Sequence, residues 1–273
     1  MIDIASLKRG WNLGNTFDAF GGETGWGNPR TTREMIDFVA QAGFDVLRVP
    51  VTWKENMGAA PNYRLNANFL LRVREVIQWG LDAGMTVILN THHEGEWLKP
   101  STEYLDKIEP RFIALWRQIA EYFGDMDERL MFEGMNEPRL EGTPNEWFGG
   151  DSQVRRAINV LNRLFVETVR ATGGNNLTRL LITTCGAQVN ERGLKDMIVP
   201  ADDNLILSLH SYCPDDYAFD RLHGRKIFDE SVDADIGAMF DTLVKFAKPL
   251  NLPIIMTEYG AVNKKFVNGK YND

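Results

Sequence analysis

Two glutamates follow apolar runs, at positions where parallel strands would bring them to a common edge. Glu137 comes directly after segment 130–136, and Glu258 follows the apolar residues 254–256. A carboxylate at the end of a buried strand is costly unless it is paired or takes part in chemistry. Either one alone could be an exposed loop residue or half of a structural ion pair. Together, across one cleft, they offer an acid for a leaving oxygen and a group that attacks or activates water, as glycoside hydrolysis requires.

Histidines at the ends of predicted strands raise the alternative of a metal site. His92, His93 and His210 account for three of the four histidines in the chain, and zinc is commonly held by such side chains. His92 and His93 are adjacent, so on a regular strand they point to opposite faces. We therefore expect no metal and no other cofactor, and a metal-dependent hydrolase remains an alternative that rests on the histidines alone.

The pattern of apolar residues predicts the elements that position these side chains. Short β-branched runs alternate with stretches of helical spacing, and the strands begin about every 40 residues. Such alternation favours parallel strands with right-handed crossovers, closed into a (β/α) barrel whose C-terminal face collects the polar strand ends. We read residues 1–273 as a single barrel domain. Strands are predicted at 11–17, 46–53, 86–92, 130–136, 180–186, 205–212 and 254–259, and helices at 31–42, 66–83, 111–123, 152–172, 191–197 and 233–247.

Composition excludes several other classes of protein. Of 273 residues, 44% are hydrophobic and 25% charged, an ordinary globular balance. The formal net charge of -8, without a basic run, argues against a nucleic-acid partner. The longest apolar runs fall far short of the roughly 18 residues that a membrane span requires. The N-terminus opens without the basic and apolar regions of a signal peptide.

Seven separated motifs, in order from about residue 7 to the end of the chain, together resemble glycoside hydrolase family 5. Within that family they are most similar to bacterial endo-β-1,4-glucanases. The motifs are Gly10-Trp11-Asn12-Leu13-Gly14-Asn15-Thr16, Trp26-Gly27-Asn28-Pro29, Leu47-Arg48-Val49-Pro50, Asn90-Thr91-His92-His93, Glu133-Gly134-Met135-Asn136-Glu137-Pro138, His210-Ser211-Tyr212 and Thr257-Glu258-Tyr259-Gly260.

The resemblance implies a role for each residue at the expected centre of the site. Glu137 is similar to the family's general acid/base and Glu258 to its nucleophile, in a retaining reaction through a covalent glycosyl-enzyme intermediate. Asn136 would bind the sugar 2-hydroxyl. Arg48 would hold Glu258 ionised, and Tyr212 would donate a hydrogen bond to the same carboxylate. His92 and His210 would line the subsite in which the sugar ring distorts.

Other residues on the predicted loops are candidates for binding a polysaccharide. Sugar rings have apolar faces that stack on indole rings, so tryptophans in the loops after the strands suit an extended glucan cleft. Trp97 is the foremost candidate for such a platform, although any one tryptophan could equally be structural. The candidate substrate-binding residues are Asn15, Trp26, Trp53, His93 and Trp97, with Trp147 also near a loop.

The chain departs from the resemblance after the second glutamate. Family members carry an eighth strand and a final helix there, whereas only fifteen residues follow Glu258. We therefore expect a barrel that is C-terminally incomplete relative to the family, with two open edge strands. The sequence could be truncated, another chain could supply the missing strand through self-association, or segment 264–272 could fold back into the gap.

The sequence thus predicts an endo-glycosidase that hydrolyses internal β-1,4 bonds of cellulose or a related β-glucan. The same machinery acting on mannan, xyloglucan or mixed-linkage glucan is the alternative within this class. A truncated, inactive glucan-binding fragment is the alternative from another class. The resemblance also implies an extracellular location, although no signal peptide is seen in the chain.

Overall fold

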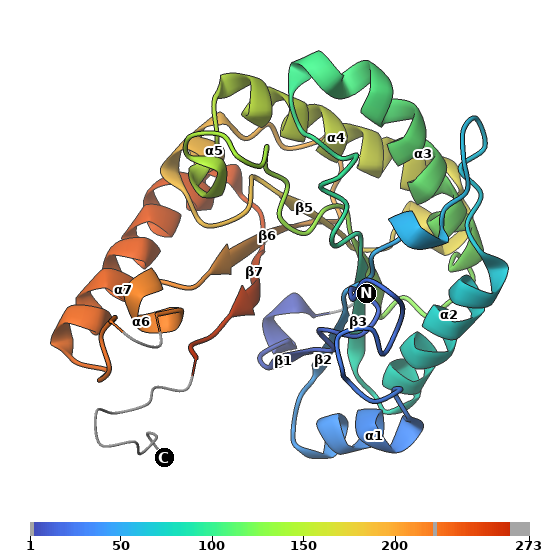
Figure 1. The fold of residues 1–273 in the computed structure, drawn as a ribbon, viewed down its shortest axis with the longest axis horizontal. Coiled ribbons are helices and arrows are strands. Elements are labelled where there is room, and N and C mark those ends of the chain that lie inside the picture. The colour runs from blue at the N-terminus through green and yellow to red at the C-terminus, as the bar shows by residue number, and fades with distance from the viewer. Residues whose placement is uncertain (1–2, 221–222, 263–273) are drawn as a thin grey trace.

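Seven parallel strands form the centre of the computed structural model, which describes residues 3–220 and 223–262 (Figure 1). The strands hydrogen-bond in chain order from β1 to β7, and every pairing is parallel. This arrangement confirms the predicted (β/α)-barrel class. The strands are β1 (Gly10–Asn12), β2 (Val46–Val49), β3 (Thr86–Asn90), β4 (Leu130–Glu133), β5 (Leu181–Thr184), β6 (Leu205–Ser211) and β7 (Ile254–Tyr259).

Helices in the crossovers surround the strands in an arc (Figure 1). Several begin at a side chain that accepts backbone N–H bonds, such as Asn66 before α2 and Asp151 before α4. The helices are α1 (Arg33–Gln41), α2 (Ala67–Asp82), α3 (Leu105–Tyr122), α4 (Ser152–Ala171), α5 (Glu191–Asp196), α6 (Asp215–Ala218) and α7 (Glu230–Thr242), and α7 continues into a π turn at Leu243–Ala247. Within the described ranges, no helix has both the length and the apolar character needed to cross a membrane.

The strands separate an outer apolar layer from a two-tiered interior. Residues such as Leu47, Leu89 and Phe132 join the large core between strands and helices. Alternate positions point inward, where a second cluster fills the lower barrel with Val46, Ile88, Met131, Leu180, Ile182 and Ile206. Two residues further along several strands, the inward positions become polar. This change places hydrogen-bonding groups at the C-terminal ends of the strands.

An open seam separates β1 from β7 in the part of the chain that the structure describes (Figure 1). A cavity of about 580 Å³ lies along it, lined by residues that include Trp11, Val46 and Ile255. Toward the C-terminal ends of β1 and β7, the Asn12 side-chain amide donates a 2.9 Å hydrogen bond to the Thr257 carbonyl. The seam is therefore bridged beside the polar end of the barrel. Segment 264–272 lies outside the described residues.

The boundaries of several elements differ from the predicted ones. The first strand ends at Asn12, because Asn15 adopts a left-handed conformation in a turn. The third helix begins before Pro110, since Ile108 and Phe112 bury the same face on either side of it. The strands predicted at 46–53, 86–92 and 130–136 are shorter, and their last residues form loops.

Candidate active site

Arg48 is the centre of a hydrogen-bond network at the C-terminal end of the barrel. Its buried guanidinium donates from Nε to Glu133 Oε2 (2.7 Å) and from Nη1 to Glu258 Oε1 (2.7 Å). Nη1 also donates to Asn12 Oδ1 (3.0 Å), and Nη2 donates to Asn136 Oδ1 (2.6 Å). The network joins β1, β2, β4 and β7, so one cation fixes residues from strands far apart in the sequence.

A shift in register between β6 and β7 brings β7 residues into this network. Leu209 pairs with Met256 but the next residue, His210, pairs with Glu258, so Thr257 is the extra residue on β7. Bulges of this kind re-aim side chains and occur often beside active sites. Consecutive residues Thr257 and Glu258 consequently both contact interior groups, Glu133 and Arg48 respectively.

The surroundings of Glu258 favour its charged form. Burial alone would raise the pKa of Glu258, but the nearby His210, the Arg48 charge and the hydrogen bonds from Arg48 and Tyr212 hold it below the ordinary value. The Tyr212 hydroxyl donates to Oε2 at 3.0 Å. Burial, followed by the charge of Glu258, raises the pKa of Tyr212, so this hydroxyl keeps its proton.

Glu137 lies in the loop after β4 with different partners. His210 Nδ1 is 2.9 Å from Glu137 Oε1, and Arg139 Nη1 is 3.6 Å from Oε2. His210 Nε2 is buried without a hydrogen-bond partner among the described residues, and a proton on Nδ1 would be donated to Glu137 Oε1. Carboxylate oxygens of Glu137 and Glu258 lie within 4.8 Å of each other.

The two adjacent histidines do not point to opposite faces, and the prediction that they would is wrong. β3 ends at Asn90, so the following residues leave strand geometry and the rings of His92 and His93 meet at 4.4 Å. Potential ligand atoms of both histidines and Asp18 lie within 4.8 Å of one another. However, Asn90 Nδ2 lies 3.0 Å from His92 Nδ1. The Asn90 amide is oriented by Val51 N–H and Glu133, so it donates to His92 and occupies the lone pair that a metal would need.

Burial and the charge of Arg48 also lower the pKa of His92 well below its ordinary value. Its Nε2 lies 4.0 Å from Glu258 Oε1. His92 is therefore a neutral ring with its proton on the side of Glu258.

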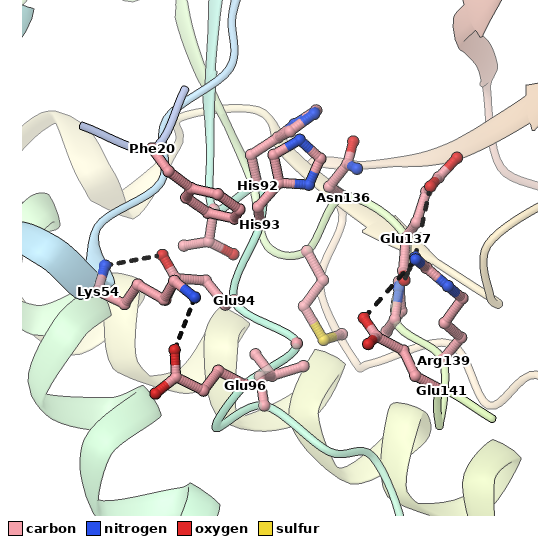
Figure 2. Close-up of a pocket in the computed structure, with 15 residues that line it drawn as sticks. Phe20, Lys54, His92, His93, Glu94, Glu96, Asn136, Glu137, Arg139 and Glu141 are labelled. Carbon is pink, nitrogen blue, oxygen red and sulfur yellow. Dashed lines mark hydrogen bonds and ion pairs between the residues drawn. The ribbon is translucent and has the colours of Figure 1, made fainter. Parts of the chain in front are cut away.

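Two hollows meet at Glu137. The first, of about 410 Å³, is lined by charged and aromatic residues, and Figure 2 shows the His92 and His93 rings beside Phe20, opposite Glu137 and Arg139. The second, of about 520 Å³, is lined by both Glu137 and Glu258 and by the exposed rings of Phe148 and Phe219. Together they form a cleft on both sides of the carboxylates.

The predicted substrate-binding residues differ in how far the structure exposes them. Trp26 is 43% exposed and contacts Phe20 and His93, while Asn15 is exposed at the turn after β1. Trp97 is half-buried, with its indole N–H donated to Glu94 and Arg111 over its ring.

The prediction that Trp53 lines the cleft is wrong. It is fully buried, packs against Phe69 and donates to the Asn90 carbonyl at 2.9 Å. Its indole is therefore part of the core between β3 and α2 and presents no face to a sugar.

Several residues of the site were not found from the sequence. They are Asn12, Asn90, Glu133, Arg139, Phe20, Phe148 and Phe219. Asn12 lies within one of the seven motifs, and Asn90 and Glu133 are the first residues of two others, so membership of a motif was an available signal. Phe148 and Phe219 lie in long crossovers, where periodicity gives no comparable signal.

Comparison with known proteins places the chain in a family. The model of the cellulase family, glycosyl hydrolase family 5, matches residues 12–273. Endoglucanase A of Ruminococcus albus is 43% identical over 269 residues, which cover 96% of this chain and 74% of that protein. Endoglucanase A of Clostridium longisporum is 40% identical, with 96% of this chain and 53% of that protein covered. The chain thus spans about half to three quarters of the length of these relatives.

Solved structures agree with this assignment. A xyloglucan-specific endo-β-1,4-glucanase from a metagenomic library, in complex with cellotriose, is 41% identical with a TM-score of 0.92, over 97% of this chain and 80% of that one. A broad-specificity endoglucanase from Ruminococcus champanellensis with bound cellotriose is 40% identical, also with a TM-score of 0.92, over 97% and 81%. The chain belongs to glycosyl hydrolase family 5. It is a glycoside hydrolase of the endoglucanase type.

Proposed function

We propose that the site hydrolyses internal β-1,4 bonds of a glucan with retention of configuration, with Glu137 as acid/base and Glu258 as nucleophile. The observation that carries this proposal is the approach of their carboxylate oxygens to within 4.8 Å. Retaining glycosidases have carboxyl groups about 5–5.5 Å apart, whereas inverting enzymes need about 6.5–9.5 Å to admit a water.

The unlike surroundings of the two carboxylates suit two different roles. Glu258 is held ionised by Arg48 and Tyr212, so an oxygen of its carboxylate can attack the anomeric carbon. The glycosidic bond breaks as Glu137 gives its proton to the leaving oxygen. In the second step Glu137 takes a proton from water, the water oxygen bonds to the anomeric carbon, and the ester to Glu258 breaks.

Neighbouring residues are proposed to orient the sugar at the reacting centre. Arg48 binds the Asn136 side-chain oxygen, which leaves the Asn136 amide N–H groups for a sugar hydroxyl. His92 and His210 flank the carboxylates and limit the shape of the space that the ring occupies. These contacts would strengthen as the ring distorts toward the transition state.

The cleft on both sides of Glu137 supports internal cleavage of a chain. Phe20, Trp26 and His93 form an aromatic group on one side, and Phe148 and Phe219 lie on the other. Solved relatives hold cellotriose, which supports a glucan substrate. One of these relatives is xyloglucan-specific and another has broad specificity, so xyloglucan and mixed-linkage glucan are proposed substrates beside cellulose.

The test is reducing-sugar release from soluble carboxymethyl cellulose, xyloglucan, mixed-linkage glucan and mannan. The chain is compared with Glu137→Gln and Glu258→Gln, which preserve shape and remove the reacting groups. Release that both substitutions abolish supports the two-carboxylate reaction, and the panel ranks the substrates. Oligosaccharide binding by calorimetry without any release would contradict the proposed hydrolysis and favour a glucan-binding role.

The open seam supports a further, separate proposal about partners. The seam cavity runs along the edges of β1 and β7, which pair with no further strand within residues 3–220 and 223–262 and so have backbone groups for an additional strand. We propose that a second copy or a further segment of polypeptide completes the sheet there. Light scattering that finds a stable monomer with full turnover would contradict association.

Because a polymeric glucan cannot enter a cell intact, we also propose that the enzyme acts outside the cell.

A further inference from the structure

Glu133 is a third carboxylate of the site, and the proposed reaction gives it no step. It ends β4 and its residue is fully buried. Its Oε2 accepts hydrogen bonds from Arg48 Nε (2.7 Å) and Asn90 Nδ2 (3.1 Å). Its Oε1 accepts from the hydroxyls of Ser208 (2.8 Å) and Thr257 (3.2 Å). Four donors from four other strands therefore hold this carboxylate below the reacting groups.

The charge of Arg48 is shared between Glu133 and Glu258. Both ion pairs have N–O distances of 2.7 Å, and the Arg48 side chain is only 3% exposed. A guanidinium at such depth is strongly destabilising unless a carboxylate compensates it. Among the described residues, these two carboxylates form the ion pairs of Arg48.

The proposed reaction changes this balance. When Glu258 bonds to the anomeric carbon, its carboxylate becomes a neutral ester. The proton that Glu137 gives to the leaving oxygen leaves a new negative charge on Glu137. That carboxylate contacts His210 and Arg139, whereas Arg48 is held by other acceptors. In the intermediate, Glu133 is thus the carboxylate still in contact with Arg48.

We propose that Glu133 is a positioning residue that compensates Arg48 while Glu258 is esterified, and thereby stabilises the covalent intermediate relative to the free enzyme. This inference rests on the proposed function, because it requires Glu258 to be the nucleophile. Glu133 has a second effect through Asn90, which it holds in the orientation that fixes the His92 ring. Both effects act through other residues, because Glu133 is fully buried.

The experiment follows formation and decay of the trapped intermediate separately. A 2,4-dinitrophenyl 2-deoxy-2-fluoro-β-cellobioside reacts because its leaving group is good, and the fluorine slows the second step so that the ester accumulates. Inactivation and reactivation rates are measured for the full chain and for Glu133→Gln, which keeps the shape and removes the charge. We expect Glu133→Gln to be inactivated about tenfold more slowly and reactivated several-fold faster, as the loss of one charge partner implies.

The outcomes separate the inference from the proposed function. Mass spectrometry of the labelled wild-type chain must find the sugar on Glu258, and a label on another residue would refute the proposed function and this inference with it. Two results with Glu258 labelled would refute the inference alone. In the first, the inactivation and reactivation rates of Glu133→Gln both equal those of the wild-type chain. In the second, both rates are lower than in the wild-type chain by the same factor, as a merely structural role would give.

A second variant, Glu133→Asp, is needed if Glu133→Gln does not fold, which a thermal melt without a cooperative transition would show. Glu133→Asp retains the charge beside Arg48, so we expect its ratio of inactivation to reactivation rates to stay within about threefold of the wild-type ratio. A tenfold shift in that ratio would overturn the inference, because charge would then not be the property that matters.

Discussion

The hydrogen bond from Tyr212 to Glu258 gives a prediction whose size can be worked from the structure. The Tyr212 hydroxyl donates to Glu258 Oε2 at 3.0 Å, and the Glu258 side chain is 16% exposed. A hydrogen bond to a charged group contributes about 1.5–3 kcal/mol, and about 1.4 kcal/mol corresponds to one pKa unit. Because Glu258 keeps some contact with solvent, Tyr212→Phe should raise the pKa of Glu258 by about one unit.

The sign of the effect on activity follows from the role of the carboxylate. Glu258 must be ionised to attack, and its lowered pKa keeps it ionised to lower pH than an ordinary glutamate. The acidic limb of the kcat/KM profile, which reports the free enzyme, should therefore lie below the ordinary glutamate range. In Tyr212→Phe this limb should move about one pH unit upward.

The assay is the pH dependence of kcat/KM on an aryl cellobioside or soluble glucan. Tyr122→Phe is the matched control, because Tyr122 lies at the end of α3 and packs against Phe123 and Arg74, away from the site. The control should leave the acidic limb in place. An acidic limb that stays in place in Tyr212→Phe, or moves to lower pH, would refute the argument that this hydroxyl stabilises the nucleophile.

Four further predictions concern the scaffold, the cleft and the cofactor requirement. Arg179→Met should lower the free energy of unfolding by about 3 kcal/mol in denaturant melts. The reason is that the buried guanidinium donates hydrogen bonds to the carbonyls of Met126, Asp127 and Leu130. The control substitution Arg163→Met, at an exposed position, should change the free energy of unfolding by less than about 0.5 kcal/mol. Glu23→Gln should raise KM for a soluble glucan about threefold with little change in kcat, since the Glu23–Arg72 pair holds the loop that carries Trp26; an unchanged KM would show that the loop is held without it. Phe219→Ala should raise KM about tenfold through lost stacking, while Phe38→Ala, at an exposed position on α1, should not. Dialysis against EDTA should leave the rate unchanged, and a loss that zinc restores would contradict the assignment of the His92 lone pair to Asn90.

The polar ends of strands were the most informative feature of the sequence. Parallel strands carry their C-terminal ends to one face, so Arg48, Glu137, His210 and Glu258 could be expected to meet without knowledge of side-chain geometry. The structure does bring these side chains together. Their roles in catalysis remain predictions.

The inward-facing positions of the strands carry a further sequence signal for the buried network. Met131, Ile206 and Ile255 point into the lower barrel. The residues two positions later are Glu133, Ser208 and Thr257, which form the buried network beneath the site. A polar residue at the same face of a strand, directly above an apolar one, therefore marked the network.

Other features depend on packing that single-strand patterns do not contain. Trp53 lies in the loop after β2, immediately before a 3-10 helix at Lys54–Asn56, and its ring is buried against Phe69. His92 and His93 meet because their strand ends two residues earlier, and strand ends are set by the partner strand. The aromatic rings of Phe148 and Phe219 enter the cleft from long crossovers, whose paths follow from tertiary contacts.

The central claim is the two-carboxylate retaining mechanism, and the most direct test is the configuration of the first product. Proton nuclear magnetic resonance can follow the hydrolysis of a cello-oligosaccharide before the product anomers interconvert. With carboxylate oxygens within 4.8 Å and Glu258 as nucleophile, the newly formed reducing end should appear as the β-anomer. Initial appearance of the α-anomer would mean that water attacks directly, and would contradict the mechanism.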